Sequence, residues 1–191
     1  MLGEESMYSA EQARNLANEL VEFLKSKIRD THRQEEWTQR NLRLLREFTR
    51  TKEAESYPSA KDAPLEQRTK QFLWDFIAYK PKSGILLAVE SEHEDKEHSI
   101  LYDFEKLLYV RSPVKLMMCR VAGEEDALKI RRTAQEFMEQ TCTWYSPGEV
   151  FVLYCIWWSG YEHDNRDFAY RLQISGECDC RGITSERFEV V

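Results

Sequence analysis

Two glutamates at the end of an apolar run are the residues of this sequence best placed to do chemistry. Five apolar residues fill positions 85–89, so the segment Gly84–Glu92 predicts a buried strand. Side chains of a strand alternate between its faces, and Glu90 and Glu92 are therefore expected on the same side. Two neighbouring carboxylates in a covered position are unfavourable unless a proton or a cation joins them.

A third acid, Asp75, lies in the preceding strand-like run at positions 71–79. If the two strands pair, Asp75 is expected to converge with Glu90 and Glu92. Carboxylates that meet without nitrogen or sulfur ligands suit Mg²⁺ or Mn²⁺. The pattern therefore predicts a three-carboxylate metal site.

The elements that would position these acids follow from periodicity. Ser9 and Gln12 form a capping-box pattern that opens a helix to about Arg29, and a second helix is expected from Trp37 to Phe48. Positions 51–66 contain two prolines and no periodicity, which indicates a loop. Ser99 is a candidate N-cap for a helix that ends at Tyr109. The remaining segments predict strands at 71–79, 85–92, 114–121, 150–158 and 168–175, with a helix at 124–141.

This order of strands and helices predicts an α/β fold, a three-layer α/β/α sandwich with a central mixed sheet. A chain of 191 residues is long enough for one domain with a sizeable core. We assign the N-terminal helices and loop to positions 1–66, the core sheet and helices to 67–176, and a polar tail to 177–191.

Composition and charge restrict the partners and the compartment. The net charge is −7, whereas proteins that bind DNA tightly and without sequence preference are usually strongly basic. The longest apolar run, at 150–158, is too short to span a bilayer, and no secretory signal pattern begins the sequence. Five cysteines without a disulfide-like framework predict reduced thiols. We expect a cytoplasmic protein without membrane contacts.

The motif and the order of elements resemble the PD-(D/E)XK nuclease-like superfamily. The resemblance covers roughly positions 10–160: Asp75 on one strand, a short turn, the apolar strand that ends in Glu90-Ser91-Glu92, a helix, and a further strand. The Val-Glu-Ser-Glu strand and the Asp-Phe-Glu-Lys-Leu-Leu helix at 103–108 also resemble uncharacterised bacterial proteins. The superfamily implies a restriction-endonuclease-like fold and metal-dependent cleavage of DNA, with Asp75 and Glu90 as metal-binding acids.

The chain departs from the superfamily at the third motif position, where Glu92 replaces the usual lysine. That lysine normally stabilises charge on the attacking water or the phosphate. Lys106, on the next helix, is a candidate substitute, but the helical period predicts that it lies near solvent, well away from the Phe104–Leu108 stripe. Lys80, beside the turn, is a second candidate.

Under the nuclease hypothesis, one or two Mg²⁺ or Mn²⁺ ions are bound by Asp75, Glu90, Glu92 and the carbonyl of Ser91, with Glu19 as an outer ligand. Glu92 would act as a base or orient the attacking water. A basic stripe on the second helix is the local candidate for phosphate contact, and DNA is the expected partner, with a homodimer as one option for the assembly. The candidate nucleic-acid-binding residues are Arg43, Arg46, Arg50 and Lys80.

Two other functions are open on the sequence alone. The chain can be an inactive relative of the same fold that serves as a binding or regulatory module, because the motif lysine is lost and the net charge is acidic. It can also be a zinc-dependent interaction protein, if Cys178, Cys180 and His163 bind zinc. The remaining features also have explanations that require no function. His93 and His98 suit a solvated charged loop, Trp157 and Trp158 suit helix packing, and the arginines suit a solvated helix face.

Overall fold

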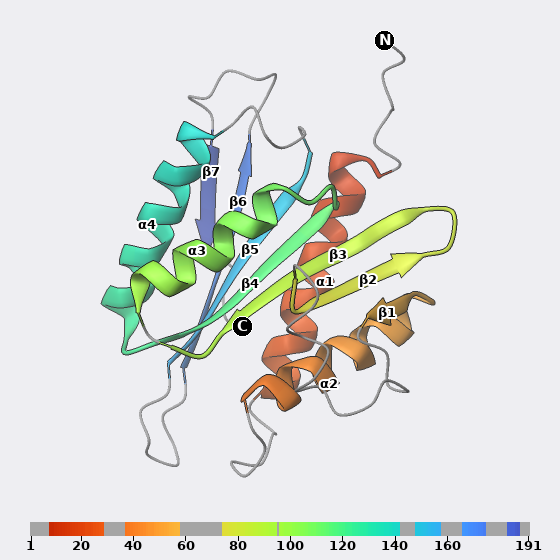
Figure 1. Cartoon of the computed structure of the whole chain (residues 1–191), viewed down its shortest axis with the longest axis horizontal. Coiled ribbons are helices and arrows are strands. Elements are labelled where there is room, and N and C mark those ends of the chain that lie inside the picture. Colours follow the sequence, from red (N-terminus) through yellow and green to blue (C-terminus); the bar gives the residue numbers. More distant parts are fainter. Residues whose placement is uncertain are drawn as a thin grey trace.

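One mixed sheet with helices on both faces forms the described part of the protein (Figure 1). The computed structural model describes residues 8–28, 37–57, 74–94, 96–141, 148–157, 166–174 and 183–187. Within these ranges the helices are α1 (Ala10–Ile28), α2 (Trp37–Thr51), α3 (Glu97–Leu108) and α4 (Glu124–Gln140). The strands are β1 (Glu55–Tyr57), β2 (Phe76–Lys80), β3 (Gly84–Glu92), β4 (Val114–Val121), β5 (Val150–Trp157), β6 (Arg166–Ile174) and β7 (Ile183–Arg187).

The seven strands lie in the sheet in the same order as in the chain. Strands β1, β2 and β3 are antiparallel neighbours, and so are β5, β6 and β7. The central pairs β3–β4 and β4–β5 are parallel. A parallel pair needs a crossover long enough to return the chain to the same end of the sheet, and α3 and α4 provide the two crossovers. The α/β class and the mixed sheet predicted from the sequence are confirmed.

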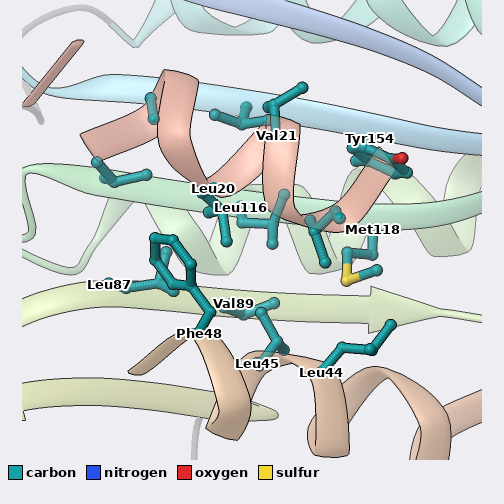
Figure 2. Close-up of a cluster of buried hydrophobic side chains, with 14 of the residues drawn as sticks. Leu20, Val21, Leu44, Leu45, Phe48, Leu87, Val89, Leu116, Met118 and Tyr154 are labelled. Atoms are coloured by element: carbon teal, nitrogen blue, oxygen red, sulfur yellow. The ribbon is translucent and has the colours of Figure 1, made fainter. Parts of the chain in front are cut away.

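Helices α1 and α2 cover one face of the sheet. The apolar stripe of each helix packs onto strand residues that alternate with residues of the opposite face. Figure 2 shows this layer, in which side chains of both helices meet the centre of β3, β4 and β5. Its labelled members are Leu20, Val21, Leu44, Leu45, Phe48, Leu87, Val89, Leu116, Met118 and Tyr154.

Helices α3 and α4 cover the other face. Ile100 and Phe104 of α3 and Ile130 of α4 are buried there with Met117 and Phe151 of the sheet. Because β3 is covered on both faces, its central residues are apolar without interruption, and the first polar residue in the run is Glu90.

A charged pair is buried where β4 and β5 begin. Lys115 has no exposed surface, and its Nζ lies 2.6 Å from Oε2 of Glu149. The same ammonium lies 4.6 Å from the centroid of the Phe151 ring. Burial lowers the pKa of Lys115, while the Glu149 carboxylate opposes the shift. The lysine is therefore held in the interior by one acid and one aromatic ring.

The capping box at the start of α1 is confirmed. The backbone N–H of Gln12 donates to Oγ of Ser9 at 3.1 Å, and the backbone N–H of Ser9 donates to Oε1 of Gln12 at 2.8 Å. These reciprocal bonds satisfy two groups that a helix end otherwise leaves without partners.

Several predicted boundaries are wrong. The loop predicted over 51–66 contains the short strand β1, which pairs with β2 through Glu55 and Tyr79. Ser99 is not an N-cap, because α3 begins at Glu97 and Lys96 occupies the cap position without a side-chain bond. Asp75 lies in a bend just before β2 rather than inside a strand. Strand β7 pairs with β6 in a segment for which the sequence predicted only a polar tail.

Among the described residues, no helix is both long and apolar enough to cross a membrane. Two of the cysteines, Cys119 and Cys155, are free thiols in this part of the chain. They are register partners on β4 and β5, with their Sγ atoms 3.5 Å apart, and burial raises the pKa of Cys155.

Candidate functional site

The end of β3 carries side chains to opposite faces of the sheet. Glu90 pairs in register with Met117 of β4, and Glu92 pairs with Cys119, so both acids lie on the face that α3 and α4 cover. Ser91, between them, faces the side of α1 and α2. Glu90 is almost fully buried, with 1% of its surface exposed, whereas Glu92 is half-buried.

Asp75 lies directly beside this strand end. The β2–β3 ladder begins where Phe76 faces Val89, so Asp75 comes opposite Glu90. Its Oδ2 accepts a hydrogen bond from the backbone N–H of Ser91 at 2.9 Å. The carboxylate thus takes the place of a strand carbonyl where the ladder ends. The structure brings Asp75 and Glu90 together, as the sequence predicted.

The two carboxyls of Asp75 and Glu90 influence each other directly. Burial and the neighbouring Asp75 raise the pKa of Glu90 to about 9, against the pull of Lys106. Burial also raises the pKa of Asp75, and the bond from the Ser91 N–H and the charge of Lys106 work against that shift. Oε1 of Glu90 is buried, and no donor in the described part of the chain bonds to it. A proton shared with Asp75, or a cation bound between them, would satisfy that oxygen.

Lys106 of α3 reaches the same carboxyl. Its Nζ lies 2.9 Å from Oε2 of Glu90 and 2.8 Å from Oδ1 of Asp103, and only 23% of the side chain is exposed. Burial lowers the pKa of Lys106, but the bonds to Asp103 and Glu90 outweigh it, and the pKa lies above its ordinary value. The prediction that Lys106 lies near solvent is therefore wrong.

The reason is the length of the lysine side chain. A helical wheel gives the direction of Cβ only, and four methylene groups let the ammonium bend back toward an acid beyond the edge of the apolar stripe. The helix itself is held in place here, because Nε1 of Trp74 donates to the backbone carbonyl of Lys106 at 3.1 Å.

Asp103 is a fourth acid of this cluster, and the sequence analysis did not identify it. Burial raises the pKa of Glu92, and Asp103 raises it further, because the two carboxyls face each other across the gap between β3 and α3. The backbone N–H of Glu94 donates to Oε1 of Glu92 at 2.8 Å. Asp103 precedes Lys106 by one helical turn, so the two side chains are expected to be neighbours on the helix that follows the motif strand. This spacing is the sequence signal that could have identified Asp103.

The four acids and Lys106 form what we call the carboxylate cluster: Asp75, Glu90, Glu92, Asp103 and Lys106. They meet as two facing carboxyl pairs, Asp75 with Glu90 and Glu92 with Asp103, with the ammonium bonded to one member of each pair. Within the described ranges, no three His, Cys, Asp or Glu side chains are grouped closely enough to hold a metal ion. The three-carboxylate ligand set stays a prediction.

Other predicted site residues lie elsewhere. Glu19, the expected outer ligand, is on α1 and pairs with Lys52, so it does not join the cluster. Lys80 ends β2, about 16 Å of extended chain from Asp75. The basic stripe belongs to α2, which packs on the face opposite the carboxylate cluster, and therefore is not continuous with it; its residues are Arg43, Arg46 and Arg50.

The remaining candidates add little to the site. His93 is exposed and its ring packs against Trp37 with 5.6 Å between centroids, and Trp157 lies against the apolar layer beneath α4. Cys178, Cys180, His163 and Trp158 fall outside the described residues, so the zinc hypothesis stays a prediction.

Comparison with known proteins gives no significant match among protein-family models, curated proteins or solved structures.

Proposed function

We propose that this protein is a metal-dependent nuclease in which Asp75 and Glu90 bind Mg²⁺ or Mn²⁺. The observation that carries the proposal is the buried Glu90 carboxyl, whose Oε1 has no donor among the described residues while Asp75 faces it. Hard divalent cations bind such oxygens, and Mg²⁺ commonly uses only one or two protein carboxylates, with waters and substrate phosphates completing its shell. A single facing pair is therefore sufficient for the proposal.

Lys106 supports the resemblance to the PD-(D/E)XK superfamily. The sequence lacks lysine at the motif position, but the ammonium of Lys106, on α3, contacts Glu90, the metal-binding acid next to that position in the motif. The strand order also agrees with the resemblance, because Asp75 precedes one strand and Glu90 lies near the end of its antiparallel neighbour, before a parallel crossover. We therefore propose the restriction-endonuclease-like arrangement for the centre of the sheet.

The roles of the chain's own residues follow from charge and position. A bound Mg²⁺ would lower the pKa of a water ligand and polarise the phosphate. The ammonium of Lys106 would stabilise negative charge that develops on the phosphate or the attacking water. Glu92 is the candidate proton acceptor, because burial and Asp103 raise its pKa and make it a stronger base than an exposed glutamate. DNA is the substrate that the resemblance implies.

Thermal melting with Mn²⁺ tests the metal site. If Mn²⁺ is present at about 100 times its dissociation constant, binding adds about 2.7 kcal/mol and raises the melting temperature by roughly 5–10 °C. Asp75→Asn keeps the acceptor for Ser91 but removes a charged ligand, so it should abolish the shift. Glu94→Gln is the matched control, because Glu94 is exposed and its carboxylate pairs with Lys96 rather than with the carboxylate cluster.

Hydrolysis of labelled single-stranded DNA, duplex DNA and RNA by the same three proteins tests the activity. Cleavage by the wild type and Glu94→Gln, but not by Asp75→Asn, supports a nuclease. A wild-type protein whose melting temperature does not respond to Mn²⁺ would rule out the metal site and with it the proposal.

A binding or regulatory module is the second candidate. The Lys106 ammonium already contacts Glu90 and Asp103 without any ion, so the cluster can also be stable as a purely structural group. Under this alternative, Mn²⁺ has no effect on melting and no nucleic acid is cleaved, although the fold is intact.

A further inference from the structure

Ser91 is bonded on both sides of β3. Its backbone N–H donates to Asp75, on the side of the carboxylate cluster. Its Oγ points to the opposite face and accepts two hydrogen bonds at 2.9 Å each, from Nε1 of Trp37 and from Nδ2 of Asn41. Trp37 and Asn41 are four residues apart on α2 and therefore project from the same side of that helix. A helix of one layer thus holds the strand end that carries the acids of the other layer.

The donors from α2 are themselves fixed. Asn41 is fully buried, and its Oδ1 accepts bonds from Nε and Nη2 of Arg40 at 3.3 and 3.4 Å. Because Arg40 can only donate, this contact orients the amide so that its NH₂ group faces Ser91. The Arg40 guanidinium also lies 4.9 Å from the centroid of the Trp37 ring, and both side chains are buried.

The end of β3 needs such support because it pairs with only one neighbouring strand there. The pairing with β2 stops at Val89, while the pairing with β4 continues to Glu92. Beyond Val89, the Asp75 carboxylate is what binds the strand on the β2 side. Since side chains alternate along a strand, a fixed direction for Ser91 Oγ also fixes the opposite direction for the Glu90 carboxyl.

We propose that Trp37, Asn41 and Ser91 are positioning residues, which hold the end of β3 so that Asp75 and Glu90 keep the geometry that binds a divalent cation. This inference rests on the proposed function. Partners that orient metal ligands from behind commonly change metal affinity by about 10–100-fold when they are removed. Ser91 follows Glu90 in the chain, and its backbone N–H binds Asp75. The bonds to Ser91 Oγ therefore affect the positions of both acids.

Two substitutions at one position separate positioning from stability. Ser91→Ala removes the acceptor for Trp37 and Asn41 but keeps the backbone N–H that binds Asp75. Ser91→Thr restores a hydroxyl and suits a strand. We expect Mn²⁺ to bind Ser91→Ala at least about tenfold more weakly than wild type in a melting titration, and Ser91→Thr to recover most of the affinity. A merely structural contact would lower the melting temperature in EDTA and leave the Mn²⁺ affinity unchanged, and that result would overturn the inference.

Amide hydrogen exchange in EDTA gives a second measurement that needs no metal. Residue 91 should exchange faster in Ser91→Ala than in wild type or Ser91→Thr, because the strand end is no longer held. If the wild type binds no Mn²⁺, the proposed function fails by itself, and the exchange rate then decides whether α2 holds the strand end: an unchanged rate refutes it. Trp37→Phe, which keeps the ring and removes only the N–H donor, replaces Ser91→Ala if that variant does not fold.

Discussion

Replacing Glu90 with glutamine should make the metal-free protein more stable. The pKa of Glu90 is raised from 4.5 to about 9 by burial and by Asp75, so the folded protein holds a proton that the unfolded chain releases. Between these two pH values the folded state binds more protons than the unfolded state, and stability therefore falls as the pH rises. At pH 7 the difference from 4.5 corresponds to about 3 kcal/mol, at about 1.4 kcal/mol per pH unit.

Glutamine removes this penalty because it has no proton to lose. Its carbonyl oxygen can accept the bond from Lys106 that Oε2 of Glu90 accepts now. Its NH₂ group then takes the place of the unpartnered Oε1 and can donate to Asp75. We expect Glu90→Gln to exceed the wild type by up to about 3 kcal/mol at pH 7 in EDTA, with little difference at pH 5.

Urea unfolding at pH 5, 7 and 8 in EDTA measures the effect, and Glu94→Gln serves as the exposed control with an unchanged pH dependence. Saturating Mn²⁺ should reverse the order, since only the wild type keeps both metal-binding carboxylates. A Glu90→Gln protein that is less stable than the wild type at pH 8 in EDTA would refute the reasoning. Glu90 would then be ionised in the folded protein, and the facing carboxyls would not share a proton.

Three further substitutions test separate parts of the structure. Lys106→Met should reduce phosphodiester cleavage by about 100-fold while Mn²⁺ still raises the melting temperature, whereas the exposed control Lys129→Met should cleave normally; equal rates would exclude a role in catalysis. Lys115→Met should lower the free energy of unfolding by about 3–5 kcal/mol in urea, because the buried Glu149 carboxylate loses the Lys115 ammonium. A loss below 1 kcal/mol, roughly that of an exposed pair, would contradict this. Ser9→Ala should lose about 1 kcal/mol in the same assay, and an unchanged midpoint would show that the cap is dispensable.

The centre of the fold is predictable because its signals are local. Strand β3 was predicted with the observed boundaries, since Gly84 follows a turn and an uninterrupted apolar run ends at charged residues. The start of α1 was equally clear, because Ser9 and Gln12 recognise each other through bonds within one helical turn. The edge strand β1 was missed because three half-exposed residues carry neither an apolar run nor a clear alternation.

The site was only partly predictable for a different reason. Asp75 and Glu90 were identified because strand pairing is a short-range rule, and their neighbours pair as expected. Asp103 was missed, and Lys106 was named as a candidate but predicted near solvent, because their contacts depend on how α3 tilts over the sheet and how far a lysine reaches. Periodicity contains neither quantity. Trp37 and Asn41 were unrecognisable for the same reason, since nothing local links them to Ser91 across 54 and 50 positions.

The sheet, whose strands follow one another from edge to edge, has a consequence for how the chain assembles. Each strand pairs with the one made before it, so every strand pairing joins consecutive strands of the chain, and pairings of low sequence separation favour rapid folding. The carboxylate cluster is encoded between positions 75 and 106, ahead of the last four strands of the sheet. The ribosome therefore synthesises the four acids and Lys106 before it synthesises β4 to β7. The later strands then pack beside residues that are already present in the chain.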